Sequence, residues 1–308
     1  MSGYAAAMSS AEVLADLAAE NGDVVLVTQD FGPIGTFTRR FPERHFDVGI
    51  SEQNLVGVAA GLAHAGKLPF VLAMAPFVSM RSFEQIRDDC AYNRNRVKIL
   101  APFAGLEAGA WGATHHALED IALLRTIPGM TIVSPADRDE AARAVRAVAA
   151  LDGPAYVRLG SLGRLQDYGA AFHLGGSSRM REGTDVAILA TGGCVAAALA
   201  AHAALAADGI AARVINVYSL KPLDRAAIEG AAREIGRLVT AEEHFIAGGL
   251  GGAVAEVLAE LGVGRLRRVG VHDVFCTEVA PYPDLLRIHG LDADGIARVA
   301  RALVAEDE

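Results

Sequence analysis

Two segments of this 308-residue sequence hold side chains that could carry out proton transfer. In residues 46–66 (FDVGISEQNLVGVAAGLAHAG), Glu52 falls between a strand and an apolar helix rich in glycine and alanine. In residues 112–130 (GATHHALEDIALLRTIPGM), His115 and His116 precede another helix. Carboxyl and imidazole groups are common general acids and bases in enzymes. Each segment is therefore a candidate catalytic segment.

Both features also have purely structural interpretations. Glu52 could be a first-turn carboxylate that the helix dipole favours, with Ser51 as the N-cap. The two histidines could be polar loop or N-cap residues. Adjacent histidines point in different directions, and no His or Cys stands nearby at zinc-ligand spacing, so we expect no metal site. Spacing alone leaves the catalytic and the structural interpretations open.

The elements that would position these residues alternate along the chain. Strand-length apolar runs alternate with stretches of helical spacing. The expected strands are 24–27, 69–72, 97–100, 131–133 and 156–159, and the expected helices are 52–65, 81–92 and 137–150. Such alternation predicts βαβ units and a parallel sheet with helices on both faces. Because doubly wound sheets bind ligands at the carboxyl ends of their strands, both candidate segments are well placed.

The alternation breaks in a Gly-, Ser- and Arg-containing stretch with one possible strand, and then resumes. The later strands are 185–189, 213–217, 237–240 and 266–271, and the later helices are 195–206, 224–234 and 252–261. The sequence therefore predicts an α/β protein of two doubly wound domains, namely residues 1–165 and a smaller domain of residues 183–308, joined by a linker at 166–182.

Composition excludes several classes of protein. The formal net charge is −9, which argues against a nucleic acid or an anionic membrane as partner. Three distant cysteines fit neither a disulfide framework nor a zinc site, so a reducing cytoplasm is the expected location. The N-terminus lacks the pattern of a signal peptide. The uncharged stretch 186–207 contains a Gly pair and is expected to form strand, turn and helix rather than a membrane span.

Several segments, in the right order, resemble the C-terminal two domains of the thiamine diphosphate enzymes of the transketolase family. They are FPERHFDVGISEQNLVGVAAGLA (41–63), GATHHALEDIALLRTIPGMTIVSPAD (112–137), GPAYVRLG (153–160), DVAILATGGCVAAALAAHAALAADGIAARVINVYSLKPLD (185–224) and VTAEEHFIAGGLGGAVAEVL (239–258). The resemblance covers nearly the whole chain. It implies a pyrimidine-binding domain at 1–165 and a transketolase C-terminal domain at 183–308.

The resemblance implies a catalytic role for Glu52. In the family, the glutamate at this position hydrogen-bonds N1′ of the cofactor's aminopyrimidine and shuttles its proton, so that N4′ can deprotonate the thiazolium C2 to give the ylid. A carboxyl group that shares a proton at neutral pH needs burial away from other charges. The sequence is consistent with this, because the helix after Glu52 is almost uncharged.

The resemblance also implies roles for aromatic and imidazole side chains. Phe77 matches the aromatic residue that stacks on the pyrimidine ring, and Phe83 matches a second aromatic position nearby. His115 matches a histidine that contacts the substrate's oxygen atoms and assists proton transfer. His116 stands where the family commonly has Gln, and we assign it to the substrate site beside His115.

Departures from the family pattern affect the substrate. Phe103 stands where transketolases usually carry a histidine, and Ala110-Trp111 stand where they have a Glu-Asp pair. Ser161 replaces an expected phosphate-binding arginine, for which Arg164 is the nearest substitute. Losing an arginine and an acidic residue and gaining two aromatics makes the pocket more apolar. We therefore expect a substrate other than an ordinary pentose phosphate.

The family's Gly-Asp-Gly motif, which together with a later Asn holds Mg²⁺ and the diphosphate, is absent from the sequence. We therefore expect one subunit of a split enzyme, inactive alone, whose separate N-terminal partner subunit holds Mg²⁺ and the diphosphate. By analogy with the family, whose cofactor lies between two chains, we expect an α₂β₂ heterotetramer. No metal is expected on this chain itself.

The resemblance implies a cytoplasmic transferase of carbohydrate metabolism, which moves a two-carbon ketol or acyl unit from a ketose or 2-oxo acid to an aldehyde or ketone. Two other enzymes stay open: a synthase like 1-deoxyxylulose-5-phosphate synthase, which FPERHFDV and the pair Phe77 and Arg81 resemble, and the β subunit of a 2-oxo acid dehydrogenase. A non-catalytic regulatory subunit is a possibility from a different class. The retained Glu52 and His115 argue against it.

Overall fold

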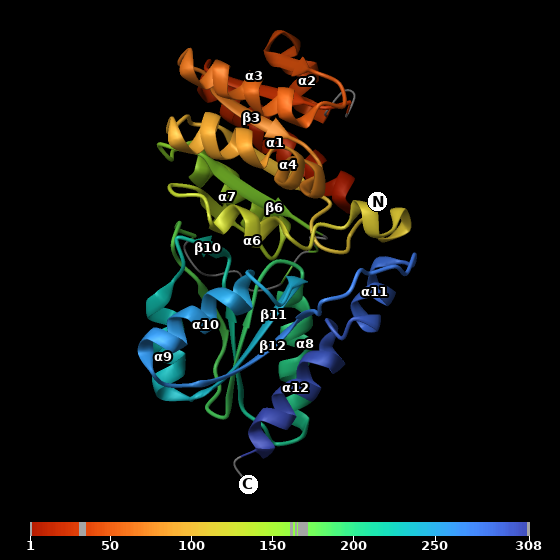
Figure 1. Ribbon diagram of the computed structural model, residues 1–308, viewed down its shortest axis with the longest axis vertical. Helices are drawn as coiled ribbons and strands as arrows, with labels where there is room; N and C mark the ends of the chain where they lie inside the picture. Colours follow the sequence, from red (N-terminus) through yellow and green to blue (C-terminus); the bar gives the residue numbers. More distant parts are fainter. Residues whose placement is uncertain (1, 31–34, 161–162, 164, 166–171, 307–308) are drawn as a thin grey trace.

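The computed structural model describes residues 2–30, 35–160, 163, 165 and 172–306, and contains two sheets arranged along the long axis of the molecule (Figure 1). The first sheet consists of β1 (Val24–Thr28), β2 (His45–Asp47), β3 (Leu68–Leu72), β4 (Lys98–Pro102), β5 (Thr131–Val133), β6 (Ala155–Leu159) and β10 (Ser219–Lys221). The second consists of β7 (Ser178–Arg181), β8 (Val186–Ala190), β9 (Ala212–Asn216), β11 (Arg237–Phe245) and β12 (Arg265–Val271).

Helices surround both sheets. The α-helices are α1 (Ser2–Glu20), α2 (Gly35–Arg40), α3 (Glu52–His64), α4 (Ala75–Arg81), α5 (Phe83–Gln85), α6 (Asp120–Arg125), α7 (Arg138–Ala149), α8 (Cys194–Ala207), α9 (Arg225–Glu234), α10 (Leu250–Leu261), α11 (Tyr282–Ile288) and α12 (Ala293–Ala305). Shorter turns are the 3₁₀ segments η1 (Pro42–Arg44), η3 (Gly109–Trp111) and η4 (Ala113–His115), and η2 (Ile86–Tyr92) is a π-helix. None of the helices in the described part of the chain combines the length and the apolar character that a membrane span requires.

The strand orders confirm two α/β domains of the doubly wound kind. The first sheet runs β10-β5-β6-β4-β3-β1-β2 and the second runs β12-β11-β8-β9-β7. Neighbouring strands are parallel except at two edges, where β10 pairs antiparallel with β5 and β7 pairs antiparallel with β9. The central strands are buried along their whole length, as parallel strands with helices on both faces must be.

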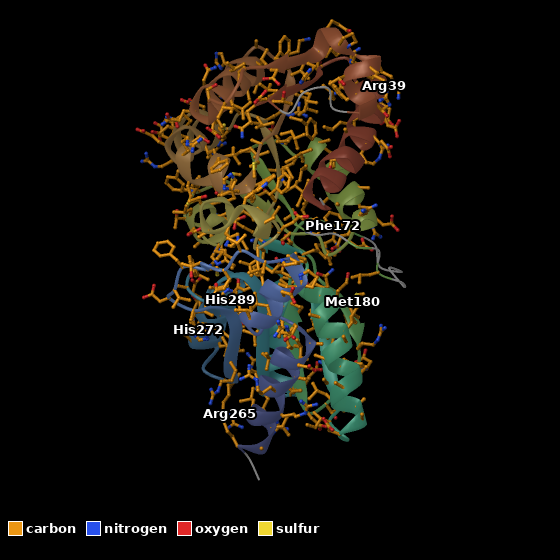
Figure 2. All side chains as sticks on the ribbon, turned by 90° about the vertical axis from the view of Figure 1, so that its right-hand side faces the viewer. Arg39, Phe172, Met180, Arg265, His272 and His289 are labelled. Carbon is orange, nitrogen blue, oxygen red and sulfur yellow. The ribbon has the colours of Figure 1, made fainter. Side chains whose placement is uncertain are left out.

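The two domains exchange structural elements and are not joined by a linker alone. Strand β10, from the expected second domain, completes the first sheet. Part of the expected linker, residues 178–181, forms β7 on the edge of the second sheet, while residues 166–171 lie outside the described part of the chain. Before β7, Phe172 stacks on Tyr218 with ring centroids 4.7 Å apart (Figure 2). One apolar core runs through both domains, from Val27 in β1 of the first sheet to Val254 in α10.

The predicted helix at 81–92 differs in the structure. α4 ends at Arg81, Ser82 breaks the run, and the chain continues through α5 into the π-helix η2. In contrast, the helix predicted from residue 137 forms as α7, because the Asp137 carboxylate caps it by accepting a hydrogen bond of 2.7 Å from the backbone N–H of Glu140.

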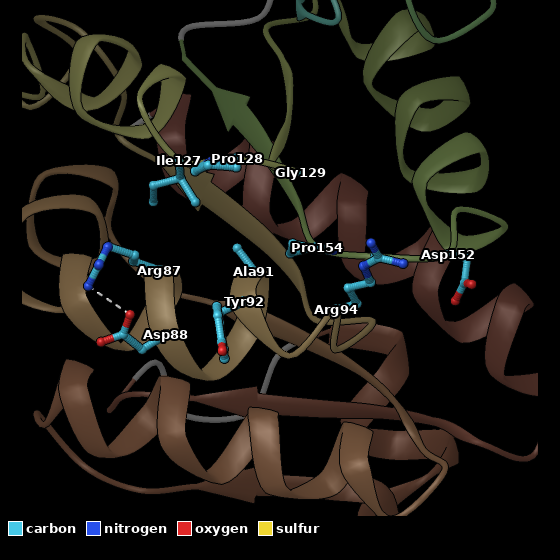
Figure 3. A pocket seen from close by; sticks show the side chains of 11 residues that line it. Arg87, Asp88, Ala91, Tyr92, Arg94, Ile127, Pro128, Gly129, Asp152 and Pro154 are labelled. Carbon is cyan, nitrogen blue, oxygen red and sulfur yellow. Dashed lines mark hydrogen bonds and ion pairs between the residues drawn. The ribbon is translucent and has the colours of Figure 1, made fainter.

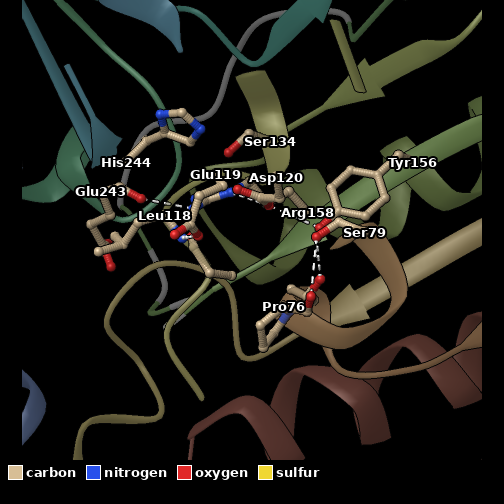
Figure 4. A network of polar contacts seen from close by, with 12 residues as sticks. Pro76, Ser79, Leu118, Glu119, Asp120, Ser134, Tyr156, Arg158, Glu243 and His244 are labelled. Carbon is tan, nitrogen blue, oxygen red and sulfur yellow. Dashed lines mark hydrogen bonds and ion pairs between the residues drawn. The ribbon is translucent and has the colours of Figure 1, made fainter. Parts of the chain in front are cut away.

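A buried ion pair lies where the domains meet (Figure 4). Arg158 Nε donates to Asp120 Oδ2 at 2.8 Å, and Tyr156 donates to the same oxygen at 2.8 Å. The other end of the guanidinium donates to two backbone carbonyls, Ala117 O at 2.9 Å and Glu243 O at 2.7 Å. The Arg158 side chain is 4% exposed and that of Asp120 is 0% exposed. The guanidinium therefore joins the first sheet to the second domain.

Replacing Asp120 with alanine should lower the free energy of unfolding by about 3–5 kcal/mol, because a buried guanidinium and a buried tyrosine hydroxyl lose their partner. Denaturant unfolding measures the loss. The control is Asp208→Ala, which breaks the half-exposed pair with Arg301 and should cost about 0–1 kcal/mol. Equal losses in the two variants would contradict a stabilising role for the buried pair.

Candidate functional site

A cavity of about 470 Å³ opens at the carboxyl ends of β1, β3 and β4, where a doubly wound sheet is expected to bind its ligand. Its lining is made of Gln29, Asp30, Ile50, Glu52, Met74, Phe77, Arg81, Phe103, Trp111 and His115. Five of the sequence-predicted site residues therefore come together from separate segments of the chain. They are Glu52, Phe77, Phe103, Trp111 and His115.

Glu52 is the first residue of α3 and is 1% exposed. The helix begins here after Ser51, whose hydroxyl donates to Val48 O at 3.0 Å instead of capping the helix. One carboxylate oxygen, Oε2, accepts a hydrogen bond of 2.5 Å from Arg81 Nη1. The other, Oε1, is buried and has no hydrogen-bond partner among the described residues. Glu52 thus keeps one oxygen available to a ligand or a shared proton.

The expectation that Glu52 lies away from other charges is wrong. Arg81, at the end of α4, forms an ion pair with it and also lies over the Phe77 ring, with its guanidinium carbon 4.9 Å from the ring centroid. A helix carries residues four apart on one face, so Phe77 and Arg81 point the same way. The helix that begins at Glu52 is almost uncharged, as expected. The positive charge beside Glu52 belongs to Arg81, on α4.

Four rings form a continuous wall of the cavity. Ring centroids are 5.2 Å apart for Phe77 and His115, 5.4 Å for His115 and Trp111, and 5.1 Å for Trp111 and Phe103. These separations are typical of favourable tilted and edge-to-face pairs. The wall gives the cavity an apolar lining beside a single carboxylate–guanidinium pair.

Phe103 has an unusual backbone conformation. It follows β4 with a positive φ of 60°, in the left-handed region that bulky side chains rarely adopt. Its side chain is 9% exposed and packs on Trp111, which is 53% exposed. Strained residues of this kind are held by their surroundings and are frequent at binding sites. The strain here turns the Phe103 ring toward the cavity.

The structure does not bring the remaining predicted residues to the cavity. Phe83 lies six residues after Phe77, which places it on a different side of the chain, and it packs against the core. His116 is buried and does not line the cavity, and both of its ring nitrogens are unpaired among the described residues. Burial is the main cause that lowers the pKa of His116. Arg164 and Ser161 lie outside the described part of the chain.

Besides Arg81, four residues line the cavity without having been predicted as site residues from the sequence: Gln29, Asp30, Ile50 and Met74. Gln29 and Asp30 follow β1 directly, and Met74 follows β3 by two residues, so the carboxyl-end rule could have found them. Asp30 also has a positive φ of 48°. Gln29 is 7% exposed and its Oε1 lacks a partner among the described residues, which gives the cavity a second polar atom with unused capacity.

A second cavity, of about 690 Å³, lies at the amino ends of β4, β5 and β6 (Figure 3). It is lined by Arg87, Asp88, Ala91, Tyr92, Arg94, Ile127, Pro128, Gly129, Asp152, Gly153 and Pro154. Arg87 forms an ion pair with Asp88 at 2.8 Å. The lining contains two arginines and two aspartates, so its formal charges balance. None of the predicted site residues lines it. Within the described residues, no group of three or more His, Cys, Asp or Glu is arranged to hold a metal ion.

Comparison with known proteins gives matches over both domains. Residues 2–161 match the family "Transketolase, pyrimidine binding domain", and residues 175–296 match "Transketolase, C-terminal domain". The chain is 40% identical over 302 residues to a subunit of the apulose-4-phosphate transketolase of Phocaeicola vulgatus, and the match covers 96% of each chain. It is 40% identical over 294 residues to a 6-deoxy-6-sulfo-D-fructose transketolase subunit of a Clostridium species, which covers 94% of this chain and 91% of that one.

A solved structure agrees with these relatives. A split-gene transketolase, described as an inactive β4 tetramer, superposes with a TM-score of 0.90 at 40% identity, covering 97% of this chain and 98% of that one. Another relative is the 1-deoxy-D-xylulose-5-phosphate synthase 1 of Geobacter sulfurreducens, which is 40% identical over 304 residues. This chain spans 47% of that synthase.

The ion pair between Glu52 and Arg81 can be measured by a double-mutant cycle. Arg81→Met leaves a buried carboxylate without its cation and should lower the free energy of unfolding by about 1–3 kcal/mol, less than for a fully buried pair because Arg81 is half exposed. In the Glu52→Gln background the same change should cost little. Additive effects of the two substitutions would mean that the pair contributes nothing to stability.

Proposed function

The chain belongs to the transketolase family, and we propose that it is the pyrimidine-binding subunit of a two-chain, thiamine diphosphate-dependent transketolase. In this proposal the enzyme moves a two-carbon ketol or acyl unit from a ketose or 2-oxo acid donor to an aldehyde or ketone acceptor. The observation that carries the proposal is Glu52, which is buried in the cavity wall with Oε1 unpaired among the described residues and with an aromatic ring beside it.

The residues present fit the pyrimidine half of thiamine diphosphate. A flat ring that bears nitrogen atoms needs a hydrogen-bonding group at its edge and an apolar face, and Glu52 Oε1 and Phe77 provide these. When bound, thiamine diphosphate supplies a carbon nucleophile and an acceptor for the electron pair that is released from the donor. Glu52 and Phe77 would hold the cofactor from this chain.

The chain's own residues then have distinct roles. Glu52 holds and releases a proton at Oε1, and its burial excludes water from that exchange. Arg81 Nη1 donates to Oε2, so Oε1, which has no partner among the described residues, is the oxygen that exchanges the proton. His115, at the cavity wall between Phe77 and Trp111, moves protons at the substrate's oxygens. The aromatic wall orients the substrate and keeps water out.

The proposed partner is a separate N-terminal subunit that holds the diphosphate and Mg²⁺ in the cytoplasm, in an α₂β₂ assembly. Two observations support it. Two relatives that this chain matches over more than nine tenths of their length are named as subunits, and the split-gene transketolase that it resembles is described as an inactive β4 tetramer. Copurification with a chain that carries Gly-Asp-Gly and a downstream Asn would identify the partner.

The aromatic wall also supports an unusual substrate. Phe103 stands where the family usually has a histidine, and Trp111 stands where it has an acidic residue. Those imidazole and carboxylate groups would hydrogen-bond sugar hydroxyls. Among the described residues, the acidic and basic side chains that line the cavity with them are Asp30, Glu52, Arg81 and His115. Relatives at the same 40% identity are named for two different sugars, apulose 4-phosphate and 6-deoxy-6-sulfo-D-fructose. We therefore propose that the substrate is not an ordinary pentose phosphate.

A synthase like 1-deoxyxylulose-5-phosphate synthase is the second candidate, because such an enzyme is also 40% identical. The β subunit of a 2-oxo acid dehydrogenase and a non-catalytic subunit are two further candidates. Assays of the two-chain complex separate them. Release of CO₂ from pyruvate together with acyl transfer to a sugar would indicate the synthase. The same release without transfer would indicate the dehydrogenase.

Glu52→Gln in the two-chain complex should lower turnover by about a hundredfold to ten-thousandfold, because the amide cannot exchange a proton at this position. Thiamine diphosphate-dependent cleavage of the donor is the measurement. The matched control is Glu84→Gln, an exposed glutamate that follows α4 closely, which should leave turnover unchanged. Full cofactor activation in Glu52→Gln would rule out the proposed role.

The substrate proposal has its own test. The complex should use xylulose 5-phosphate and ribose 5-phosphate poorly, because the wall offers these polar sugars few hydrogen bonds. Steady-state kinetics with both sugars measures this. Phe103→His, which restores the imidazole usual at this position, should improve their use. Efficient turnover of both sugars by the unmodified complex would contradict the proposal.

A further inference from the structure

Two residues of the aromatic wall, Trp111 and His115, lie on a loop that closes on itself. Gly105 and Ala117 exchange two backbone hydrogen bonds, of 3.1 Å and 2.9 Å, which form the neck of the loop. Residues 105–117, here called the site loop, hold Trp111 and His115, and Phe103 stands just before the neck. The loop contains only the short turns η3 and η4, so its own hydrogen bonds do not fix where its ring side chains point.

The second domain holds the neck through Glu243, on β11. Glu243 Oε2 accepts a hydrogen bond of 3.4 Å from the backbone N–H of Leu106, and Oε1 accepts one of 2.5 Å from the Tyr282 hydroxyl on α11. Glu243 is 3% exposed. Burial raises the pKa of Glu243, while the hydrogen bond from Tyr282 opposes the increase. The carboxylate therefore joins the site loop to two elements of the second domain.

Two glycines leave the space that this carboxylate occupies. A Cβ at Gly105 would lie 2.5 Å from Glu243 Oε2, and a Cβ at Gly193 would lie 2.3 Å from Glu243 Oε1. Gly105 also has a positive φ of 64°. Neither position accepts a larger residue while Glu243 stays in place. The site loop and α8 are therefore shaped around Glu243.

The far part of the site loop also rests on the second domain. A Cβ at Gly109 would lie 2.6 Å from Ala280 O and 2.6 Å from the Leu285 side chain. A Cβ at Gly112 would lie 3.3 Å from Val279. In Figure 1, α11 lies beside this part of the first domain. The second domain therefore contacts the site loop on both sides of Trp111.

We propose that Glu243 is a positioning residue, through which the second domain fixes the site loop and so sets the placement of Trp111 and His115 in the cavity. Glu243 does not line the cavity, so it acts through the loop and not on the substrate. The consequence for catalysis rests on the proposed function. The consequence for loop geometry does not.

The neighbouring residue provides a matched control. Glu242 is on the same strand and is 0% exposed, but its carboxylate accepts from the backbone N–H groups of Leu250 and Gly251 at the start of α10. Burial raises the pKa of Glu242 as well. Glu242 therefore shares the burial and the chemistry of Glu243, but its carboxylate holds α10 instead of the site loop.

The experiment compares Glu243→Met with Glu242→Met in the full chain. Trp111 is the only tryptophan in the sequence, so intrinsic fluorescence and its quenching by acrylamide report on the site loop directly. Glu243→Met should increase quenching and speed hydrogen exchange at the Leu106 and Ala117 amides by about tenfold to a hundredfold. Glu242→Met should change neither. Glu243→Gln, which keeps an acceptor for Leu106, should restore most of the protection.

Tyr282→Phe tests the same contact if Glu243→Met fails to fold, because it removes only the hydroxyl that holds Glu243. It should shift quenching and exchange in the same direction by a smaller amount. In the two-chain complex, with hydroxypyruvate as donor, Glu243→Met should lower kcat/KM about tenfold, chiefly through KM. Quenching and exchange equal to those of Glu242→Met would overturn the proposal, whether or not the complex turns over hydroxypyruvate. Full activity in Glu52→Gln would overturn the proposed function but not the positioning role of Glu243, which quenching and exchange measure without turnover.

Discussion

The structure depends on the buried guanidinium of Arg158. A cation that is almost completely buried must have its charge and its N–H groups satisfied within the protein. Arg158 meets this requirement with partners from three places: the Asp120 carboxylate at the start of α6, the carbonyl of Ala117 at the neck of the site loop, and the carbonyl of Glu243 in the second domain. Separating the domains would leave part of the guanidinium without partners. The domain contact and the loop neck are therefore coupled through one side chain.

The site loop has polar contacts at its neck and ring side chains at its middle. The neck of the site loop is held by charged groups that face the domain boundary, whereas its middle presents Trp111 and His115 to the cavity. Phe103, two residues before Gly105 of the neck, has a left-handed backbone conformation. An apolar wall assembled from a loop needs such support, because stacking between rings is too weak to fix the backbone that carries them.

The helices that cover the sheets also shield the Glu52 carboxylate from solvent. α3 starts at the carboxyl end of the first sheet and buries Leu55, Val56 and Ala59 in the core. Glu52, at the start of the same helix, is therefore buried as well. The core continues into the second domain, and β10 completes the first sheet from there. Glu52 forms an ion pair with Arg81 through Oε2, and Oε1 has no hydrogen-bond partner among the described residues, so a molecule that enters the cavity can bind to Oε1.

The sequence by itself determined the alternation of the central strands with helices, the doubly wound α/β class and the family. Period, turn residues and motifs are local, and β5 (Thr131–Val133) matches its predicted range without change. It also singled out Glu52, Phe77, Phe103, Trp111 and His115, chiefly through the family resemblance. Only the tertiary structure decided which charged group meets Glu52, that His116 and Phe83 do not line the cavity, and that Glu243 contacts the site loop. Those contacts join residues that are 29 to 137 positions apart, and no local pattern specifies such packing.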